Sequence, residues 1–283
     1  MKVLAPTCEF ARVLASVLSI AEAKTALAAG VDIVDLKNPA AGALGALPVA
    51  DIAAIVRMIG GRRPVSATIG DLPMQAALIG AAIERTAAAG VDFIKIGLFD
   101  DGDARSCLDA LRPLARHRQL VAVLFADRDF DSDLVDTAAA SGFAGVMLDT
   151  ADKSGGGLRS HVSESALGEF VAKARARNMF TGLAGKLRLA DIPFLLPLAP
   201  DYLGFRGALC TGFERAAAID ENAIRDVLRA AGRSLPAAPS GQRTPIKSAP
   251  VAPDKAPALV SGPAPETTIG AVEACVYTEY PAP

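Results

Sequence analysis

Short apolar runs alternate with alanine-rich helical patterns from residue 12 to residue 231, and this alternation limits the possible folds more than any other feature. Runs of this length predict buried strands, and the helical patterns between them supply crossovers to parallel neighbours. Helices are expected, for example, at residues 21–29, 75–89, 104–117 and 164–177. Eight strands are predicted, at residues 12–18, 31–37, 64–69, 91–97, 119–124, 143–149, 179–184 and 201–206.

Eight strand–helix units in about 220 residues fit a closed (β/α)8 barrel better than an open sheet. An open doubly wound sheet is the alternative, although no Gly-x-Gly-x-x-Gly turn follows the first run. The phrase Ala-Ala-Gly-Val-Asp occurs at 28–32 and again at 88–92, where glycine ends a helix and Val-Asp opens a strand. The interval of 60 residues is about two strand–helix units, which suits a barrel assembled from repeats.

The composition changes near Leu235. The last 48 residues, 236–283, hold 10 of the 19 prolines, mixed with alanine, serine, glycine and threonine. Proline blocks helix continuation, and such a stretch buries too little apolar surface to offset its chain entropy. We therefore predict a catalytic barrel domain over residues 1–234 and a disordered Pro/Ala-rich tail over residues 235–283.

Charge and cysteine content exclude several classes of protein. With 29 Lys and Arg against 31 Asp and Glu, the chain has no electrostatic footprint for nucleic acid or an anionic membrane. The apolar residues 13–21 resemble a short signal peptide, but charges on both sides favour a buried first strand in a cytoplasmic protein. Four dispersed cysteines and two histidines show no metal-ligand spacing, so neither a metal site nor a disulfide scaffold is expected.

Charged residues end every second predicted strand. Alternation along each strand turns Lys37, Lys95, Asp149 and Arg206 inward at the ends of the second, fourth, sixth and eighth runs, with Asp35 on the same face as Lys37. In a barrel, side chains from alternate strands share a layer, and active sites lie at the C-terminal mouth. These charges are expected to meet there, either around a charged ligand or as internal salt bridges that only fill the barrel.

Two inward lysines have a specific chemical consequence. Each cation disfavours protonation of the other, and burial adds to this effect. A neutral lysine amine attacks carbonyl groups to form a Schiff base, and a second lysine, or Asp35 beside Lys37, can move protons.

Glycine-rich loops follow the seventh and eighth predicted strands, where barrel enzymes often bind phosphate. Backbone N–H groups of Gly185, Gly207 and Ala208 are expected to contact the phosphate, with Lys186 or Arg206 supplying positive charge.

Two further loops carry candidate residues. Asp71 ends the third run and is either a substrate-binding or general-acid residue or the N-cap of the next helix. The glycine-rich segment after Asp149 is a candidate mobile lid.

Five segments together resemble the (5-formylfuran-3-yl)methyl phosphate synthase family, also called 4-(hydroxymethyl)-2-furancarboxaldehyde-phosphate synthase. The resemblance covers residues 13–231 in order, and its most specific block is Asp-x-Lys-Asn-Pro-x-x-Gly-x-Leu-Gly, at 35–45. Residues 1–11 and the tail after 235 fall outside it. The segments are VDIVDLKNPAAGALG at 31–45, VSATIGD at 65–71, DFIKIG at 92–97, MLDTA at 147–151 and LGFRGA at 203–208.

The resemblance implies a TIM barrel that joins two molecules of glyceraldehyde 3-phosphate into a furan aldehyde phosphate, with loss of phosphate and water, for methanofuran-type one-carbon cofactors. It implies a lyase in which Lys37 forms the Schiff base and Lys95 accepts a proton. Asp149 and Lys153 become further active-site groups. No organic cofactor or metal is implied, and the apolar helix faces of a barrel favour a homo-oligomer.

Two other functions stay open at this point. One is an ordinary class I aldolase that makes an acyclic sugar phosphate. The other is a non-catalytic barrel that binds a sugar phosphate and has no need of two facing lysines.

Overall fold

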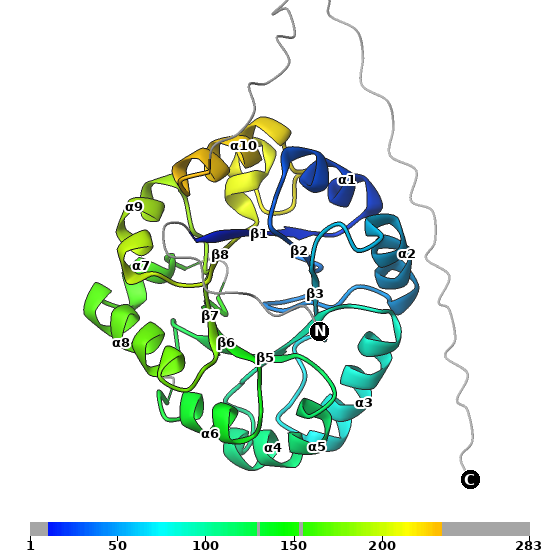
Figure 1. Cartoon of the computed structure of the whole chain (residues 1–283), viewed down its shortest axis with the longest axis vertical. Coiled ribbons are helices and arrows are strands. Elements are labelled where there is room, and N and C mark those ends of the chain that lie inside the picture. The colour runs from blue at the N-terminus through cyan, green and yellow to red at the C-terminus, as the bar shows by residue number, and fades with distance from the viewer. Residues whose placement is uncertain (1–10, 129–130, 153–154, 234–283) are drawn as a thin grey trace, which may run out of the picture. The chain divides into compact units, whose positions relative to one another are not determined.

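The strands form a closed parallel barrel in which each pairs with the next and β8 pairs with β1 (Figure 1). The computed structural model describes residues 11–128, 131–152 and 155–233. The predicted (β/α)8 barrel is confirmed, and each predicted strand end lies within two residues of the observed one. The strands are β1 (Arg12–Val17), β2 (Ile33–Leu36), β3 (Val65–Thr68), β4 (Phe93–Gly97), β5 (Leu120–Phe125), β6 (Gly145–Asp149), β7 (Phe180–Leu183) and β8 (Tyr202–Phe205).

Helices surround the barrel, and α10 closes the ring beside α1 (Figure 1). The helix predicted at 104–117 is divided into α4 and α5, because Pro113 lies in the first turn of α5 and has no N–H to continue the ladder of α4. The helices are α1 (Ile20–Ala29), α2 (Val49–Ile59), α3 (Ala76–Ala88), α4 (Ala104–Ala110), α5 (Arg112–Ala115), α6 (Leu134–Ala140), α7 (Leu158–His161), α8 (Glu164–Arg175), α9 (Ile192–Leu195) and α10 (Glu221–Ala230). Short 3-10 turns occupy Leu189–Asp191, Leu196–Leu198, Gly207–Leu209 and Thr211–Phe213.

The repeated Ala-Ala-Gly-Val-Asp phrase joins helices to strands as expected. Gly30 and Gly90 follow α1 and α3 with φ angles of 92° and 87°, which glycine adopts without steric cost. The Asp32 carboxylate accepts the N–H of Val13 at 2.9 Å, and Asp92 makes the same bond to the first residue of β3, also at 2.9 Å. Each repeat therefore ends a helix and ties the new strand to the preceding one.

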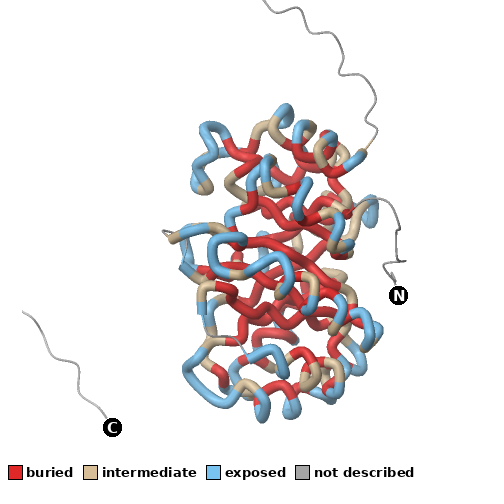
Figure 2. The backbone as a smooth tube through the Cα atoms, turned by 90° about the vertical axis from the view of Figure 1, so that its left-hand side faces the viewer, coloured by how far each residue is buried: buried red, intermediate tan, exposed pale blue. Residues whose placement is uncertain are grey.

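Strand alternation separates an inner from an outer apolar layer. Ile33, Phe93 and Met147 belong to the cluster inside the barrel, as predicted. Val34 and Ile94 belong to the larger cluster between the strands and the helices, again as predicted. Buried strands occupy the centre of the molecule, and exposed residues lie on the outer helices and loops (Figure 2).

Aromatic rings fill the N-terminal end of the barrel. Phe93, Phe180 and Tyr202 open β4, β7 and β8, and their ring centroids lie 5.4 Å and 6.2 Å apart in succession. Gly182 makes room for them, since a Cβ at this position would lie 2.2 Å from the Tyr202 ring. The inward charges are consequently confined to the opposite, C-terminal end.

Two predictions lie outside the described residues, namely the disordered tail at 235–283 and the role of Lys153. Within the described ranges, no helix is long and apolar enough to cross a membrane.

Candidate active site

A cavity of about 250 Å³ opens at the C-terminal mouth of the barrel. Its lining includes all four of the predicted inward charges, Lys37, Lys95, Asp149 and Arg206. The predicted phosphate loops reach the same cavity through Gly185, Lys186, Gly207 and Ala208. The two amines and the candidate phosphate loops therefore line the same cavity.

Lys37 and Asp149 form an ion pair across the mouth. Lys37 follows β2 and Asp149 ends β6, and the Lys37 Nζ lies 3.3 Å from the Asp149 Oδ2. Both side chains are about nine-tenths buried, so the pair is shielded from solvent while still lining the cavity. A carboxylate at this distance holds the amine in position and can accept a proton from it.

Lys95 and Asp35 form a second and more deeply buried pair. The Lys95 Nζ lies 2.7 Å from the Asp35 Oδ1, with side-chain exposures of 3% and 0%. Asp35 also accepts hydrogen bonds from the hydroxyls of Ser16, at 2.8 Å, and Ser66, at 2.6 Å. Three donors thus fix this carboxylate under the amine of Lys95.

Burial lowers the pKa of the Lys95 amine below the ordinary value of 10.5. The charge of Asp35 acts in the opposite direction, and the neighbouring Lys37 cation lowers the pKa further. Lys37 therefore lies close enough to Lys95 to disfavour protonation of the Lys95 amine. Internal salt bridges are present as well, so the charges are paired and also exposed to a cavity.

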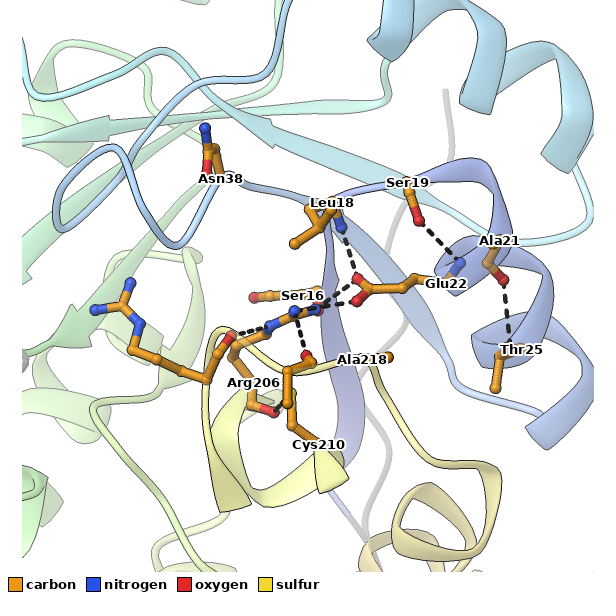
Figure 3. A network of polar contacts seen from close by, with 12 residues as sticks. Ser16, Leu18, Ser19, Ala21, Glu22, Thr25, Asn38, Arg206, Cys210 and Ala218 are labelled. Atoms are coloured by element: carbon orange, nitrogen blue, oxygen red, sulfur yellow. Dashed lines mark hydrogen bonds and ion pairs between the residues drawn. The ribbon is translucent and has the colours of Figure 1, made fainter. Parts of the chain in front are cut away.

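Arg206 departs from the predicted arrangement. Arg206 lines the cavity, as alternation along β8 predicts, but the backbone is irregular there, with φ −133° and ψ −69°. Its guanidinium instead makes a bidentate ion pair with Glu22 of α1, at 2.6 Å and 3.1 Å (Figure 3). The phosphate contact predicted for Arg206 would require one of its present bonds to break, and it stays a prediction.

Asp71 fixes the loop that follows Lys37. Its two carboxylate oxygens accept the N–H groups of Ala43 and Leu44, both at 2.7 Å. Gly42 has a φ of 107°, and a Cβ there would lie 2.2 Å from the Asp71 Oδ2, which explains the glycine of the Asn-Pro-x-x-Gly block. The N-cap alternative for Asp71 is wrong, because α3 begins at Ala76 with Gln75 as its N-cap. Its substrate-binding role stays a prediction.

The phosphate loops have the backbone form expected of close-approach turns. Gly185 has a φ of 101°, and Lys186, next in the chain, also has a positive φ, of 52°. The Lys186 Nζ contacts the carbonyl oxygen of Gly155 across the cavity rim. Gly207 and Ala208 belong to the 3-10 turn directly after β8. These features place polar backbone at the cavity, while their role in phosphate binding stays a prediction.

Sequence reasoning missed four residues of this region, Ser16, Ser66, Glu22 and Arg215. The serines had a detectable signal, since each is a polar residue inside an apolar run, and the structure pairs both in register with Asp35, from β1 and from β3. Glu22 and Arg215 had none, because their partners are distant in the chain and no periodicity points to them. Among the described residues, no group of three or more histidine, cysteine or acidic side chains is arranged to hold a metal ion.

Fold and cavity together define the class: a TIM barrel with a charged, partly enclosed site at its C-terminal mouth. Solved structures agree with the fold. The crystal structure of 3-hexulose-6-phosphate synthase matches with a TM-score of 0.57 and 21% identity, over 77% of this chain and 99% of that one. Phosphoribosyl anthranilate isomerase from Thermus thermophilus also has a TM-score of 0.57, at 13% identity over 77% of this chain and 97% of its own.

The sequence belongs to a more narrowly defined group. The chain is a member of the 4-HFC-P synthase family, whose sequence model matches residues 13–228. It is 35% identical over 232 residues to the (5-formylfuran-3-yl)methyl phosphate synthase of Methanopyrus kandleri, covering 77% of this chain and 98% of that one. A Methylorubrum extorquens protein whose name gives this activity provisionally is 45% identical over 219 residues, 77% of this chain and 91% of its own. The family resemblance inferred from the sequence is confirmed.

Proposed function

We propose that this protein is a (5-formylfuran-3-yl)methyl phosphate synthase, which condenses two molecules of glyceraldehyde 3-phosphate through a lysine Schiff base. The observation that carries the proposal is the pair of buried lysines, Lys37 and Lys95, in one cavity at the barrel mouth. Buried amines are costly to a fold, and an ordinary barrel core has no need of them. Relatives that bear the name of this activity support the choice of reaction.

In the proposed mechanism, the Lys37 amine attacks the carbonyl carbon of one triose phosphate and expels water to give an imine. Asp149, 3.3 Å from the amine, holds Lys37 in place and takes up the proton released in this step. Lys37 is the better nucleophile of the two by position, because Lys95 lies deeper in the barrel.

Lys95 then acts as the base that removes a proton from the carbon next to the imine. Its lowered pKa raises the share of the neutral amine, which is the form able to accept this proton. Asp35 stabilises the resulting ammonium ion at 2.7 Å. The imine carries the electron pair of the broken C–H bond as an enamine, so no external electron sink is required.

The enamine carbon attacks the aldehyde of the second triose phosphate and forms the new carbon–carbon bond. Elimination of one phosphate, ring closure by a hydroxyl group and dehydration produce the furan, and hydrolysis of the imine releases Lys37. Overall, two triose phosphates give one furan aldehyde phosphate, one phosphate and two waters. No oxidant or reductant enters this balance, and the reaction is that of a carbon–oxygen lyase acting on phosphates.

The test is incubation of the purified protein with glyceraldehyde 3-phosphate alone, followed by ultraviolet spectroscopy and mass spectrometry of the product. A furan aldehyde absorbs well above the protein band, whereas an acyclic aldol product of a class I aldolase does not. Tight binding of a phosphate ester without turnover would instead identify a non-catalytic barrel.

Borohydride reduction in the presence of substrate tests the Schiff base itself. We expect added mass on the peptide that contains Lys37, and none in Lys37→Ala. Lys24→Ala is the matched control, since Lys24 is exposed on α1 and remote from the cavity lining. Equal trapping in Lys37→Ala and wild type would show that another amine forms the imine.

A further inference from the structure

Arg206 uses all of its donors to fix the loop that follows β8. A guanidinium has five N–H groups. Two are bonded to Glu22 (Figure 3). The same guanidinium also donates to the carbonyl oxygens of Ser16 at 3.1 Å, Arg215 at 2.8 Å and Ala217 at 3.0 Å. Five bonds from five N–H groups leave Arg206 a positioning residue with no donor for a ligand.

The loop that Arg206 holds carries a second arginine to the cavity. Arg215 follows the turn at Thr211–Phe213, and its own carbonyl oxygen is the acceptor of the Arg206 Nε. The Arg215 side chain lines the cavity that contains Lys37 and Lys95. It also lines an adjoining hollow of about 330 Å³, whose other residues include Asp71 and Arg128.

Arg215 makes fewer hydrogen bonds than Arg206. Its guanidinium is half-buried, and its one hydrogen bond to a described residue runs from Nη2 to the carbonyl oxygen of Gly42 at 3.5 Å. It makes no ion pair with a carboxylate among the described residues, whereas the neighbouring Arg128 is paired with Asp100 at 2.7 Å. A half-buried cation with most of its donors unused, at the junction of two hollows, is arranged to receive an anion.

We propose that Arg215 binds the phosphate group of one of the two triose phosphates, while the Glu22–Arg206 pair positions it. This inference rests on the proposed function, because condensation of two triose phosphates brings two phosphate groups to one mouth. The loops at Gly185 and Gly207 are the candidates for one of them. Arg215 supplies a bidentate donor for the other, from a separate loop.

Glycerol 3-phosphate tests the assignment by binding alone, since it has the phosphate but no carbonyl to form an imine. Isothermal titration should show its affinity falling about 10- to 100-fold in Arg215→Gln, the usual effect of losing charge-assisted hydrogen bonds. Arg215→Lys should recover part of the loss, because it keeps the charge but not the planar fork. Arg112→Gln is the matched control, since Arg112 is exposed on α5 and forms an ion pair with the exposed Asp109.

Turnover provides the second readout. The KM for glyceraldehyde 3-phosphate should rise in Arg215→Gln by a similar factor with a smaller change in kcat. Borohydride trapping at saturating substrate should be retained, since Lys37 is intact. A purely structural role would instead lower the melting temperature and leave the affinity of the folded fraction unchanged.

The outcomes separate this inference from the function on which it rests. Wild-type protein that makes the furan, with an Arg215→Gln variant of unchanged KM and unchanged glycerol 3-phosphate affinity, would overturn the role of Arg215 alone. Wild-type protein that binds glycerol 3-phosphate through Arg215 but makes no furan would overturn the proposed reaction and support the phosphate site.

Discussion

Replacing Asp35 with asparagine should destabilise the protein by an amount that depends on pH. The substitution preserves the shape of the side chain but removes the charge that pairs with the Lys95 ammonium at 2.7 Å in a site of 0% and 3% exposure. Lys95 then has two options. It keeps an unpaired buried charge, at a cost of about 3–5 kcal/mol, or it releases its proton.

The cost of proton release follows from the ordinary lysine pKa of 10.5. Each pH unit below that value costs about 1.4 kcal/mol, so release costs about 5 kcal/mol at pH 7 and about 2 kcal/mol at pH 9. Whichever of these two states costs less free energy determines how much stability the variant loses. We therefore expect Asp35→Asn to lose about 3–5 kcal/mol of unfolding free energy at pH 7 and at most about 2 kcal/mol at pH 9.

The sign agrees with proton linkage. Because the folded-state pKa of Lys95 is lowered, the unfolded chain binds more protons between that pKa and 10.5. The contribution of this group to stability therefore rises with pH through that window. In Asp35→Asn the window begins at a lower pH, since the attraction that holds the proton is gone.

Urea denaturation followed by far-UV circular dichroism measures the effect, because the chain has no tryptophan for fluorescence. Each variant is compared with wild type at the same pH, so that other titrating groups cancel. The double variant Lys95→Met/Asp35→Asn has no amine to titrate, so its unfolding free energy should lack the part of the pH dependence that Lys95 causes in Asp35→Asn. An equal loss for Asp35→Asn at both pH values would falsify this account of the Lys95–Asp35 pair.

Three further predictions concern the same end of the barrel. The rate of furan formation should rise with pH as Lys95 loses its proton, with a midpoint below 10.5, and a rate that falls over this range would contradict its role as base. Gly185→Ala should lose about 1–3 kcal/mol in urea titration, since φ is 101° and the new Cβ would lie 2.9 Å from a Thr150 methyl group; unchanged stability would argue against this loop geometry. Glu22→Gln should lose about 3–5 kcal/mol by leaving the Arg206 charge unpaired, and a variant as stable as wild type would show that the pair is not held in this way.

The barrel and its inward charges were predictable because both follow from short-range patterns. A strand buried on both faces produces an apolar run in the sequence. Side chains alternate along a strand, so every second residue of a run can be assigned to the inner face. Asp35 and Lys37 stand out in this way, since charge inside an apolar run has few explanations besides a site. Their convergence with Lys95 and Asp149 at the mouth then follows from the geometry of alternate strands in a closed barrel, whereas the partner of each amine came from the structure.

The contacts of Arg206 could not be predicted from such patterns. Alternation assigns it an inward direction, but the strand ends at Phe205 and the backbone at Arg206 leaves the extended region. Its partner Glu22 lies 184 residues away on α1, and no local pattern joins them. The contacts of a residue just beyond a strand depend on which loops pack around it, and those are fixed by tertiary structure alone.

The charge balance of the mouth explains why Arg215 matters to the proposed chemistry. Lys37 and Lys95 are matched by Asp149 and Asp35, so the two pairs together leave little net charge to attract anionic substrates. Arg206 is neutralised by Glu22 in the same way. Two phosphate esters entering this cavity therefore need cations outside the pairs, and Arg215 on the loop after β8 and Lys186 on the loop after β7 both line it. In the proposed reaction, Lys37 and Lys95 can then keep their carboxylate partners for proton transfer, because phosphate binding by other cations does not use these carboxylates.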